Sequence, residues 1–500
     1  MKLNTISYLA CLAAAVSCTT SAQNAKCPAS VVSVFADADE TASADSPKAP
    51  LIAVPFDGNG QERILSDLIA AGALPSLIPS ELTDFNLLRD YAASVDGFVI
   101  TEGFSMELDA EVRDAGIHSE ALLLLKAMMD RNVPIYGSSD LLSSINLSYK
   151  RIDEKYSSVE DFVSRASTYR RAKALMDRIL SVDSHNDQPC EYDNGASVGL
   201  RKSNQVSIQK MTEGHLVSAV LVDYLGQGEN DAESLAKAVS KCRGILKEIK
   251  EDVAKFSDFC GIATNEQEAR ALRTQGKNAF FIGIENAYGI GDDLSNIERY
   301  RREGVVYMTL CHMADNLVCH TSRAKSPNHH LGLTDFGYKV VEELNRCGML
   351  VDLSHASEQT FWDVIKVSKA PIACTHSGAK ALYGHDRNIT DAQLKALAEN
   401  GGVIQVYFVD NFLTADETKT SVYDMADHID HCVSVAGIDH VGIGSDFDGG
   451  GGGWGFNGSN DAINLTVLLM ERGYSNEDIE KLWGGNFMRV LSEVQTLGEI

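Results

Sequence analysis

The chain has 500 residues, of which 44% are hydrophobic, and a formal net charge of −26. The hydrophobic share is ordinary for a globular protein with a sizeable core, and the length favours two domains, one of them large. A chain this acidic has no excess of Lys and Arg with which to bind nucleic-acid phosphates or anionic lipid. We therefore expect no nucleic-acid partner and a small-molecule substrate.

The first residues have the composition of an export signal. Lys2 precedes an apolar run at 6–16 and then small residues, which predicts a signal peptide over 1–22 with cleavage after Ala22. A lipoprotein signal ending before Cys18 is the alternative, and it would place a lipid anchor on that cysteine. Residues 23–48 are rich in Ala, Ser and Asp and are predicted to be a linker. The expected location is outside the cytoplasm, either in a periplasm or as a membrane-anchored lipoprotein.

Residues 49–150 have the pattern of a small α/β domain. Short apolar runs alternate with helical stretches such as 61–71 and 118–131, which favours a flavodoxin-like parallel sheet. The four runs predicted to be strands are 51–58, 74–80, 96–103 and 133–140. A polar, helix-forming stretch at 151–178 then leads to the second domain.

The second predicted domain, residues 165–500, contains eight apolar runs with helical patterns between most of them. The helical patterns include 231–250, 334–347, 390–399 and 421–436. Eight strands alternating with helices predict a (β/α)8 barrel of the TIM type, and an open doubly wound sheet is the structural alternative. The eight runs are 179–185, 216–225, 279–285, 305–312, 348–355, 370–376, 401–408 and 440–446.

Acidic and histidine residues stand at or directly after the ends of five of these runs. Burial of such groups is costly unless they are paired or bind a metal, and the carboxyl ends of barrel strands meet at one mouth. Imidazole and carboxylate are also ligands of zinc and similar cations. The pattern predicts a metal-dependent enzyme. The six residues are His185, Asp187, Glu285, His355, His376 and Asp446.

Several long segments in this region resemble one family of enzymes. They include VDSHND, YMTLCH, GLTDFGYKVVEELNRCGMLVDLSHASEQTFWDV, SKAPIACTHSGAKAL, RNITDAQLKALAENGGVI and HVGIGSDFDGG. In this order they resemble the membrane dipeptidase (renal dipeptidase) family, binuclear zinc peptidases of the amidohydrolase superfamily. The resemblance covers residues 170–500 and implies a metallodipeptidase that holds two divalent cations, with Zn²⁺ as the expected metal.

The resemblance also implies a role for individual residues. Glu285 matches the ligand that bridges both cations and takes part in catalysis, and Asp446 matches the strand-eight aspartate, which contacts substrate and carries the proton. His312 matches a substrate-contacting histidine, and Arg387 matches the arginine that holds the substrate carboxylate. The implied metal ligands are His185, Asp187, Glu285, His355 and His376.

The chemistry of these residue types agrees with those roles. A guanidinium pairs a carboxylate in a planar, bidentate way, and an imidazole can donate to a carbonyl oxygen that gains charge. We expect hydrolysis of dipeptides with a free carboxylate by a metal-bridging hydroxide. The alternatives are another small amide, a lactam or an ester as substrate, or an inactive barrel used for binding. A homodimer is the assembly that we consider besides a monomer.

Two further features of the sequence can be interpreted. The first domain faintly resembles a degenerate class I glutamine amidotransferase, with Ser138-Ser139-Asp140 at the turn where the nucleophilic cysteine would stand, and we expect it to be noncatalytic. His428 and His431 are three residues apart on a predicted helix among aspartates. A third metal site could be drawn from them, but we interpret them as part of a solvated acidic face.

Overall fold

The computed structural model describes residues 49–54, 61–78, 85–100, 120–137, 156–199, 204–323, 327–328 and 330–500. The predicted signal peptide, Cys18, the 23–48 linker and the turn at Ser138-Ser139-Asp140 lie outside these residues. Within the described part of the chain, no helix is long and apolar enough to cross a bilayer.

The N-terminal region contains a parallel sheet of four short strands in the order β2-β1-β3-β4. All four lie inside the runs predicted to be strands. The strands are β1 (Leu51–Val54), β2 (Leu74–Leu77), β3 (Gly97–Val99) and β4 (Ile135–Tyr136). The helices are α3 (Gln61–Ala70), α4 (Phe85–Ser94), α6 (Glu120–Asp130) and the long α8 (Val159–Met176). This small parallel α/β sheet was predicted from the sequence.

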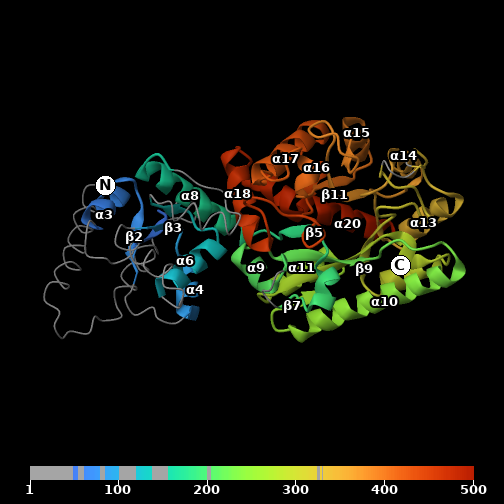
Figure 1. Ribbon diagram of the computed structural model, residues 1–500, viewed down its shortest axis with the longest axis horizontal. Coiled ribbons are helices and arrows are strands. Elements are labelled where there is room, and N and C mark those ends of the chain that lie inside the picture. The colour runs from blue at the N-terminus through green and yellow to red at the C-terminus, as the bar shows by residue number, and fades with distance from the viewer. Residues whose placement is uncertain are drawn as a thin grey trace. The chain divides into compact units, whose positions relative to one another are not determined.

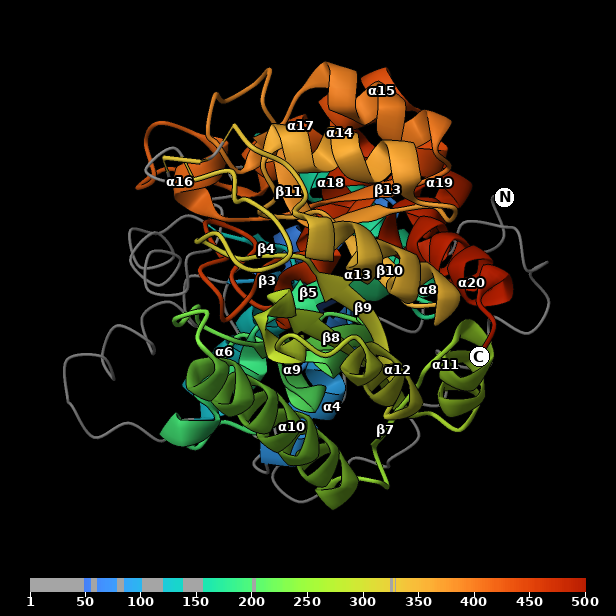
Figure 2. The same ribbon diagram turned by 90° about the vertical axis from the view of Figure 1, so that its right-hand side faces the viewer.

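The C-terminal region is a barrel-like sheet of eight parallel strands that pair in the order β14-β13-β11-β10-β9-β8-β6-β5. Figure 2 shows the strands at the centre, with helices outside them. The strands are β5 (Val182–Asn186), β6 (Ser218–Tyr224), β8 (Asn278–Glu285), β9 (Val305–Thr309), β10 (Leu350–Asp352), β11 (Ala373–Ala379), β13 (Val403–Val406) and β14 (Val441–Ile443). The predicted fold class is therefore confirmed, and each strand overlaps one predicted run.

The ring closes between its first and last strands through the chain that follows β14. The amide of Asp446 donates to the carbonyl of His185 (3.0 Å), and the amide of Asp187 donates to the carbonyl of Phe447 (2.8 Å). Asn186 and Phe447 form the corresponding parallel bridge. These bonds hold the segment that carries Asp446 directly against the end of β5.

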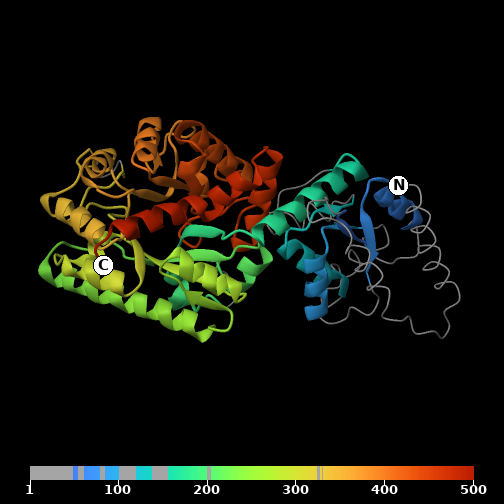
Figure 3. The same ribbon diagram turned by 180° about the vertical axis from the view of Figure 1, so that it is seen from behind.

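Helices cover the outside of the barrel (Figures 1 and 2), and α20 at the C-terminus packs against β10, β13 and β14 (red in Figure 3). The helices are α9 (Ile208–Glu213), α10 (Ala232–Lys255), α11 (Glu266–Thr274), α12 (Ser295–Arg302), α13 (Asp335–Arg346), α14 (Glu358–Val367), α15 (Asp391–Glu399), α16 (Asp410–Leu413), α17 (Val422–Ala436), α18 (Ala462–Glu471), α19 (Asn476–Glu480) and α20 (Asn486–Leu497). Side-chain caps mark the starts of several of them; Thr334, for example, accepts from the amide of Gly337 at the start of α13.

Two short strands were not predicted. β7 (Cys260–Ile262) pairs with the beginning of β8, and β12 (Asn388–Ile389) pairs with the end of β11. Some strand ends also differ from the predicted ones. Glu285 is the last residue of β8, but β11 continues past His376, whereas His355 and Asp446 each follow the end of their strand by three residues.

Candidate metal centre

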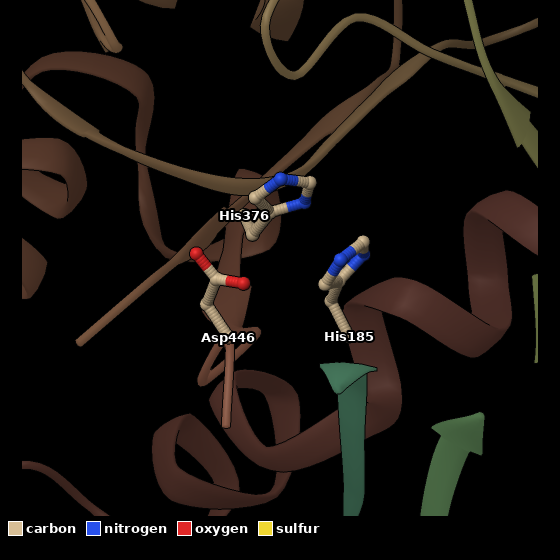
Figure 4. Close-up of side chains that lie close together, drawn as sticks. All are labelled: His185, His376 and Asp446. Carbon is tan, nitrogen blue, oxygen red and sulfur yellow. The ribbon is translucent and has the colours of Figure 1, made fainter. Parts of the chain in front are cut away.

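The six predicted residues lie together at one end of the barrel and are buried. His185 Nε2 is 3.7 Å from Asp187 Oδ2 and 3.8 Å from Glu285 Oε2. Glu285 Oε1 is 3.0 Å from His355 Nε2 and 3.3 Å from His376 Nε2. Glu285 Oε2 is therefore nearest His185, and Oε1 is nearest His355 and His376. Figure 4 shows His185 and His376 with Asp446, turned toward one another.

The donor set fits a divalent metal. Potential ligand atoms lie within 4.8 Å of one another in three overlapping groups. These groups are His185–Asp187–Glu285, Glu285–His355–His376 and His185–His376–Asp446. Among the described residues, His185 Nε2, Asp187 Oδ1 and Glu285 Oε1 are buried without a hydrogen-bond partner. Buried polar atoms are normally satisfied, so these atoms are arranged to bind a ligand from outside the chain.

The pKa values of the charged groups in the centre also indicate that it is suited to bind positive charge. Burial, together with the charge of Asp187, raises the pKa of Glu285 well above its usual value and that of Asp446 to about 7. Burial opposes the charging of His185, yet Asp187 and Glu285 outweigh it and raise the His185 pKa to about 9. Carboxylates crowded in this way are stabilised by a proton or by a cation.

The pKa values of the other two histidines are shifted in the opposite direction, downward. Burial, reinforced by nearby cationic groups such as Arg387, lowers the pKa of both His355 and His376 well below the usual value. Their Nε2 atoms are 2.9 Å apart. Neutral imidazole is the form that binds metals, so this pair is already in the protonation state that coordination requires.

The backbone around the centre adopts an uncommon conformation. Asn286, His355, Asp446 and Asp448 all have positive φ, at 80°, 68°, 63° and 62°. Residues other than glycine rarely occupy this region, and such positions concentrate at functional sites where the surrounding structure fixes them. Asn286 directly follows the predicted site residue Glu285, and His355 and Asp446 are themselves predicted site residues. The conformation turns His355 and Asp446 toward the centre after their strands have ended.

His312 and Arg387 lie beside the cluster. The ring centroid of His312 is 4.3 Å from that of His355 and 4.7 Å from that of Tyr224 on β6. Burial, and then the charge of Arg387, lowers the pKa of His312 to about 4, so its ring is neutral at neutral pH. Arg387 is buried, and its Nη2 donates to the carbonyl of His376 (3.0 Å), but its Nε has no hydrogen-bond partner in the described part of the chain.

Comparisons with known proteins identify the family of the chain. The family model of membrane dipeptidase (peptidase family M19) matches residues 169–499. The chain belongs to this family. It is therefore a hydrolase of the metallodipeptidase type, built on a TIM barrel.

Several individual dipeptidases are similar to this chain over most of their length. Dipeptidase tcpJ of Claviceps purpurea is 33% identical over 59% of this chain and 70% of its own. The uncharacterized dipeptidase C965.12 of Schizosaccharomyces pombe is 31% identical over 65% of this chain and 83% of its own. The crystal structure of the probable dipeptidase PvdM from Pseudomonas aeruginosa is 29% identical, with a TM-score of 0.62 over 66% of this chain and 99% of that one.

Buried hydroxyl groups behind the histidines were not predicted from the sequence. Tyr307 Oη on β9 is 2.8 Å from His185 Nδ1, and Thr375 Oγ1 on β11 is 3.0 Å from His376 Nδ1. Asp352 on β10 accepts from the hydroxyls of Thr375 (2.7 Å) and Thr309 (2.5 Å). Tyrosine and threonine are common in buried strands. The one available signal was that Thr375 directly precedes His376, whereas Tyr307 stands five residues before His312, the nearest predicted site residue.

The loop after β14 is held against the M19 barrel by Gln205. The amide of Gln205 donates to Asp448 Oδ1 (2.7 Å), the amide of Asp448 donates to Gln205 Oε1 (2.7 Å), and Gln205 Nε2 donates to the carbonyl of Gly451 (2.8 Å). A polar cleft of about 410 Å³ adjoins this contact; Gln205, Asp448 and Glu191 are among its lining residues. These bonds fix the segment two residues beyond Asp446.

His428 and His431 are not a metal site, and the interpretation of His428 as solvated is wrong. His428 is buried on α17, where its Nδ1 accepts from the amide of Ala379 (3.0 Å) and its Nε2 is 3.2 Å from the carbonyl of Leu413. His431 pairs with Asp391 at 2.8 Å. Both imidazoles therefore have protein partners, and His428 supports the end of β11.

Proposed function

We propose that this protein is an exported dipeptidase that uses two divalent cations, with Zn²⁺ as the expected metal, to hydrolyse dipeptides that have a free carboxylate. The observation that carries the proposal is the position of Glu285, whose Oε2 lies 3.8 Å from His185 Nε2 and whose Oε1 lies 3.0 and 3.3 Å from the Nε2 atoms of His355 and His376. A carboxylate in this position suits a bridge between two cations. The family membership supplies the reaction class.

In the proposed mechanism, each residue near the cluster acts on one part of the substrate. The cations, when bound, supply a hydroxide nucleophile at neutral pH and polarise the scissile carbonyl. Asp446 takes the remaining proton of that hydroxide after it attacks the carbonyl carbon and passes this proton to the leaving amine as the carbon–nitrogen bond breaks. His312, neutral because of its lowered pKa, donates to the carbonyl oxygen as that oxygen gains negative charge.

Arg387 provides the preference for a free carboxylate. Its guanidinium is buried, and within the described residues no carboxylate of the chain pairs with it. A buried cation without an anionic partner is costly, and a substrate carboxylate would supply that partner. The Arg387 guanidinium is thus complementary to the C-terminal carboxylate of a short peptide.

The alternative substrates are other small amides, lactams or esters that fit the same centre. A panel of L,L and L,D dipeptides, measured beside N-acyl amino acids and a lactam, separates these classes. We expect kcat/KM to be highest for dipeptides and to fall when the C-terminal carboxylate is converted to an amide. Equal rates for the amide would contradict the role of Arg387, and a protein that binds no divalent metal would contradict the whole proposal.

The proposed location rests on the N-terminal sequence alone. Lys2, the apolar run at 6–16 and the small residues before Ala22 support export, and Cys18 supports lipid anchoring as the alternative. Replacement of Cys18 by serine distinguishes the two. Loss of membrane association in that variant would indicate a lipoprotein, whereas a mature N-terminus at Gln23 would indicate a cleaved signal peptide.

A further inference from the structure

Two hydroxyl groups contact the histidines of the candidate centre on the side away from the cluster. Tyr307 Oη lies 2.8 Å from His185 Nδ1 and 3.1 Å from the carbonyl oxygen of Ser184. Thr375 Oγ1 lies 3.0 Å from His376 Nδ1 and 2.7 Å from Asp352 Oδ2. In each case, the hydroxyl stands between an imidazole nitrogen and an oxygen that accepts hydrogen bonds.

The direction of each hydrogen bond follows from a count of protons. A backbone carbonyl and a carboxylate cannot donate, so the Tyr307 proton is directed to Ser184 and the Thr375 proton to Asp352. Each hydroxyl oxygen then accepts from the imidazole beside it, which places a proton on Nδ1 of His185 and of His376. In the neutral ring, the lone pair is left on Nε2, the atom that faces Glu285.

We propose that Tyr307 and Thr375 are positioning residues that hold His185 and His376 in the Nδ1–H tautomer, so that both Nε2 atoms are ready to bind a cation. This inference rests on the proposed metal centre. His355 differs, because its Nδ1 has no hydrogen-bond partner among the described residues. The proposal therefore concerns two of the three histidines.

The neighbouring strand β8 leaves space for the ring of Tyr307. Gly283 on β8 is the register partner of Tyr307. A Cβ at position 283 would stand 2.6 Å from the ring carbon Cε2 of Tyr307 and 2.8 Å from its hydroxyl, too close for any side chain. The absence of a side chain at Gly283 thus lets the buried tyrosine cross the barrel interior toward His185.

Thr375, whose Oγ1 also lies 3.4 Å from His185 Nδ1, is held by Asp352. Asp352 accepts from the hydroxyl and the amide of Thr375 (2.7 and 2.8 Å) and from the hydroxyl of Thr309 (2.5 Å). A carboxylate with this many donors is fixed in place and remains an acceptor. Because Thr309 bonds the same carboxylate without touching a histidine, it offers a matched comparison.

The test measures zinc affinity in purified full-length protein, with a chelating indicator as competitor. We expect Tyr307→Phe and Thr375→Val each to weaken zinc binding about ten- to a hundredfold, the range for partners behind metal ligands. The controls Tyr300→Phe and Thr309→Val each remove a buried hydroxyl that has no histidine contact. They should change the affinity less than about twofold. Gly283→Ala, which keeps the hydroxyl but displaces the ring, should resemble Tyr307→Phe.

A second measurement distinguishes positioning from a general loss of structure. With ¹⁵N-labelled histidine in the zinc-loaded protein, the shifts of His185 and His376 should report a protonated Nδ1 in the wild type and a mixture of states in the variants. Excess zinc should restore most of kcat. Wild-type affinity in both variants, or an equal loss in both controls, would overturn the inference. A wild-type protein that binds no zinc would overturn the proposed function itself.

Discussion

His355 Nε2 and His376 Nε2 lie 2.9 Å apart, and both face Glu285 Oε1. Burial keeps both rings neutral, since it lowers both pKa values well below the usual range. Two neutral nitrogen atoms at this separation bring their lone pairs together unless a proton or a metal lies between them or beside them. A cation bound to Glu285 would relieve this contact as well as the excess negative charge.

Metal removal should therefore affect both activity and stability. Because a metal that binds only the folded state stabilises it by mass action, by about 4 kcal/mol at a thousandfold excess over Kd, chelation should lower the melting temperature and abolish dipeptide hydrolysis. Re-addition of Zn²⁺ should restore both. Activity that is insensitive to a chelator, in a protein shown to be metal-free, would contradict this expectation.

The His355→Ala variant tests the ligand assignment at a single position. Loss of this imidazole should reduce kcat by on the order of a hundredfold or more, since removal even of a partner behind a ligand costs that much. The metal-free fold should persist, because the substitution also removes the close contact with His376. Circular dichroism and metal content per chain are the controls. His431→Ala, on α17 and outside the centre, should retain full activity.

Arg387→Lys should discriminate between substrates rather than abolish activity. Loss of bidentate pairing to a carboxylate removes a charge-assisted hydrogen bond of about 1.5–3 kcal/mol, equivalent to roughly ten- to hundredfold in kcat/KM. The loss should appear for dipeptides and not for their C-terminal amides. A matched loss for both substrates would indicate that Arg387 acts through its bond to the His376 carbonyl instead.

Asp446 should determine the acid side of the pH profile. A general base must be ionised, and burial with the nearby Asp187 raises the pKa of Asp446 to about 7. Bound cations favour the ionised form, so kcat/KM should rise with pH through a midpoint at or below about 7. Asp446→Asn should lower kcat by about 10²–10⁴ and remove this limb. An unchanged acid limb in the variant would assign it to another group.

The fold could be predicted from sequence because each barrel strand is an apolar run that ends in turn or charged residues. The strands that were missed, β7 and β12, have only three and two residues and, unlike the equally short β10 and β14, do not lie in one of the longer apolar runs. Their pairing depends on the neighbouring β8 and β11, and this tertiary context is invisible in the local sequence.

Residues of the candidate site could be predicted where they are polar residues within or at the end of an apolar run. A histidine or glutamate that interrupts a buried strand is conspicuous, and Glu285 and His376 were found in this way. Tyr307 and Thr375 are not conspicuous, because both residue types favour strands. What gives them a role is the position of their hydroxyl groups beside His185 and His376, and only the folded barrel brings these residues together.

A buried carboxyl group outside the centre should make stability depend on pH. Asp223 on β6 is fully buried; its Oδ2 accepts only from the Cys242 thiol (3.2 Å), and its Oδ1 has no hydrogen-bond partner in the described structure. Burial raises the pKa of Asp223 well above the usual value. Above about pH 4 the unfolded chain loses this proton while the folded chain keeps it, so stability falls as pH rises toward the folded pKa.

Asp223→Asn should remove this dependence, because the amide resembles the protonated acid and cannot ionise. We expect its melting temperature to exceed that of the wild type at pH 8, and the difference to shrink toward pH 4. Asp252→Asn on α10 is the matched comparison, since Asp252 Oδ1 accepts from the Ser197 hydroxyl (2.7 Å) and Oδ2 from the Val198 amide (2.8 Å). That variant should be less stable than the wild type at pH 8, because an amide nitrogen replaces one acceptor. A melting temperature of Asp223→Asn that follows the wild type at every pH would show that Asp223 does not govern the effect.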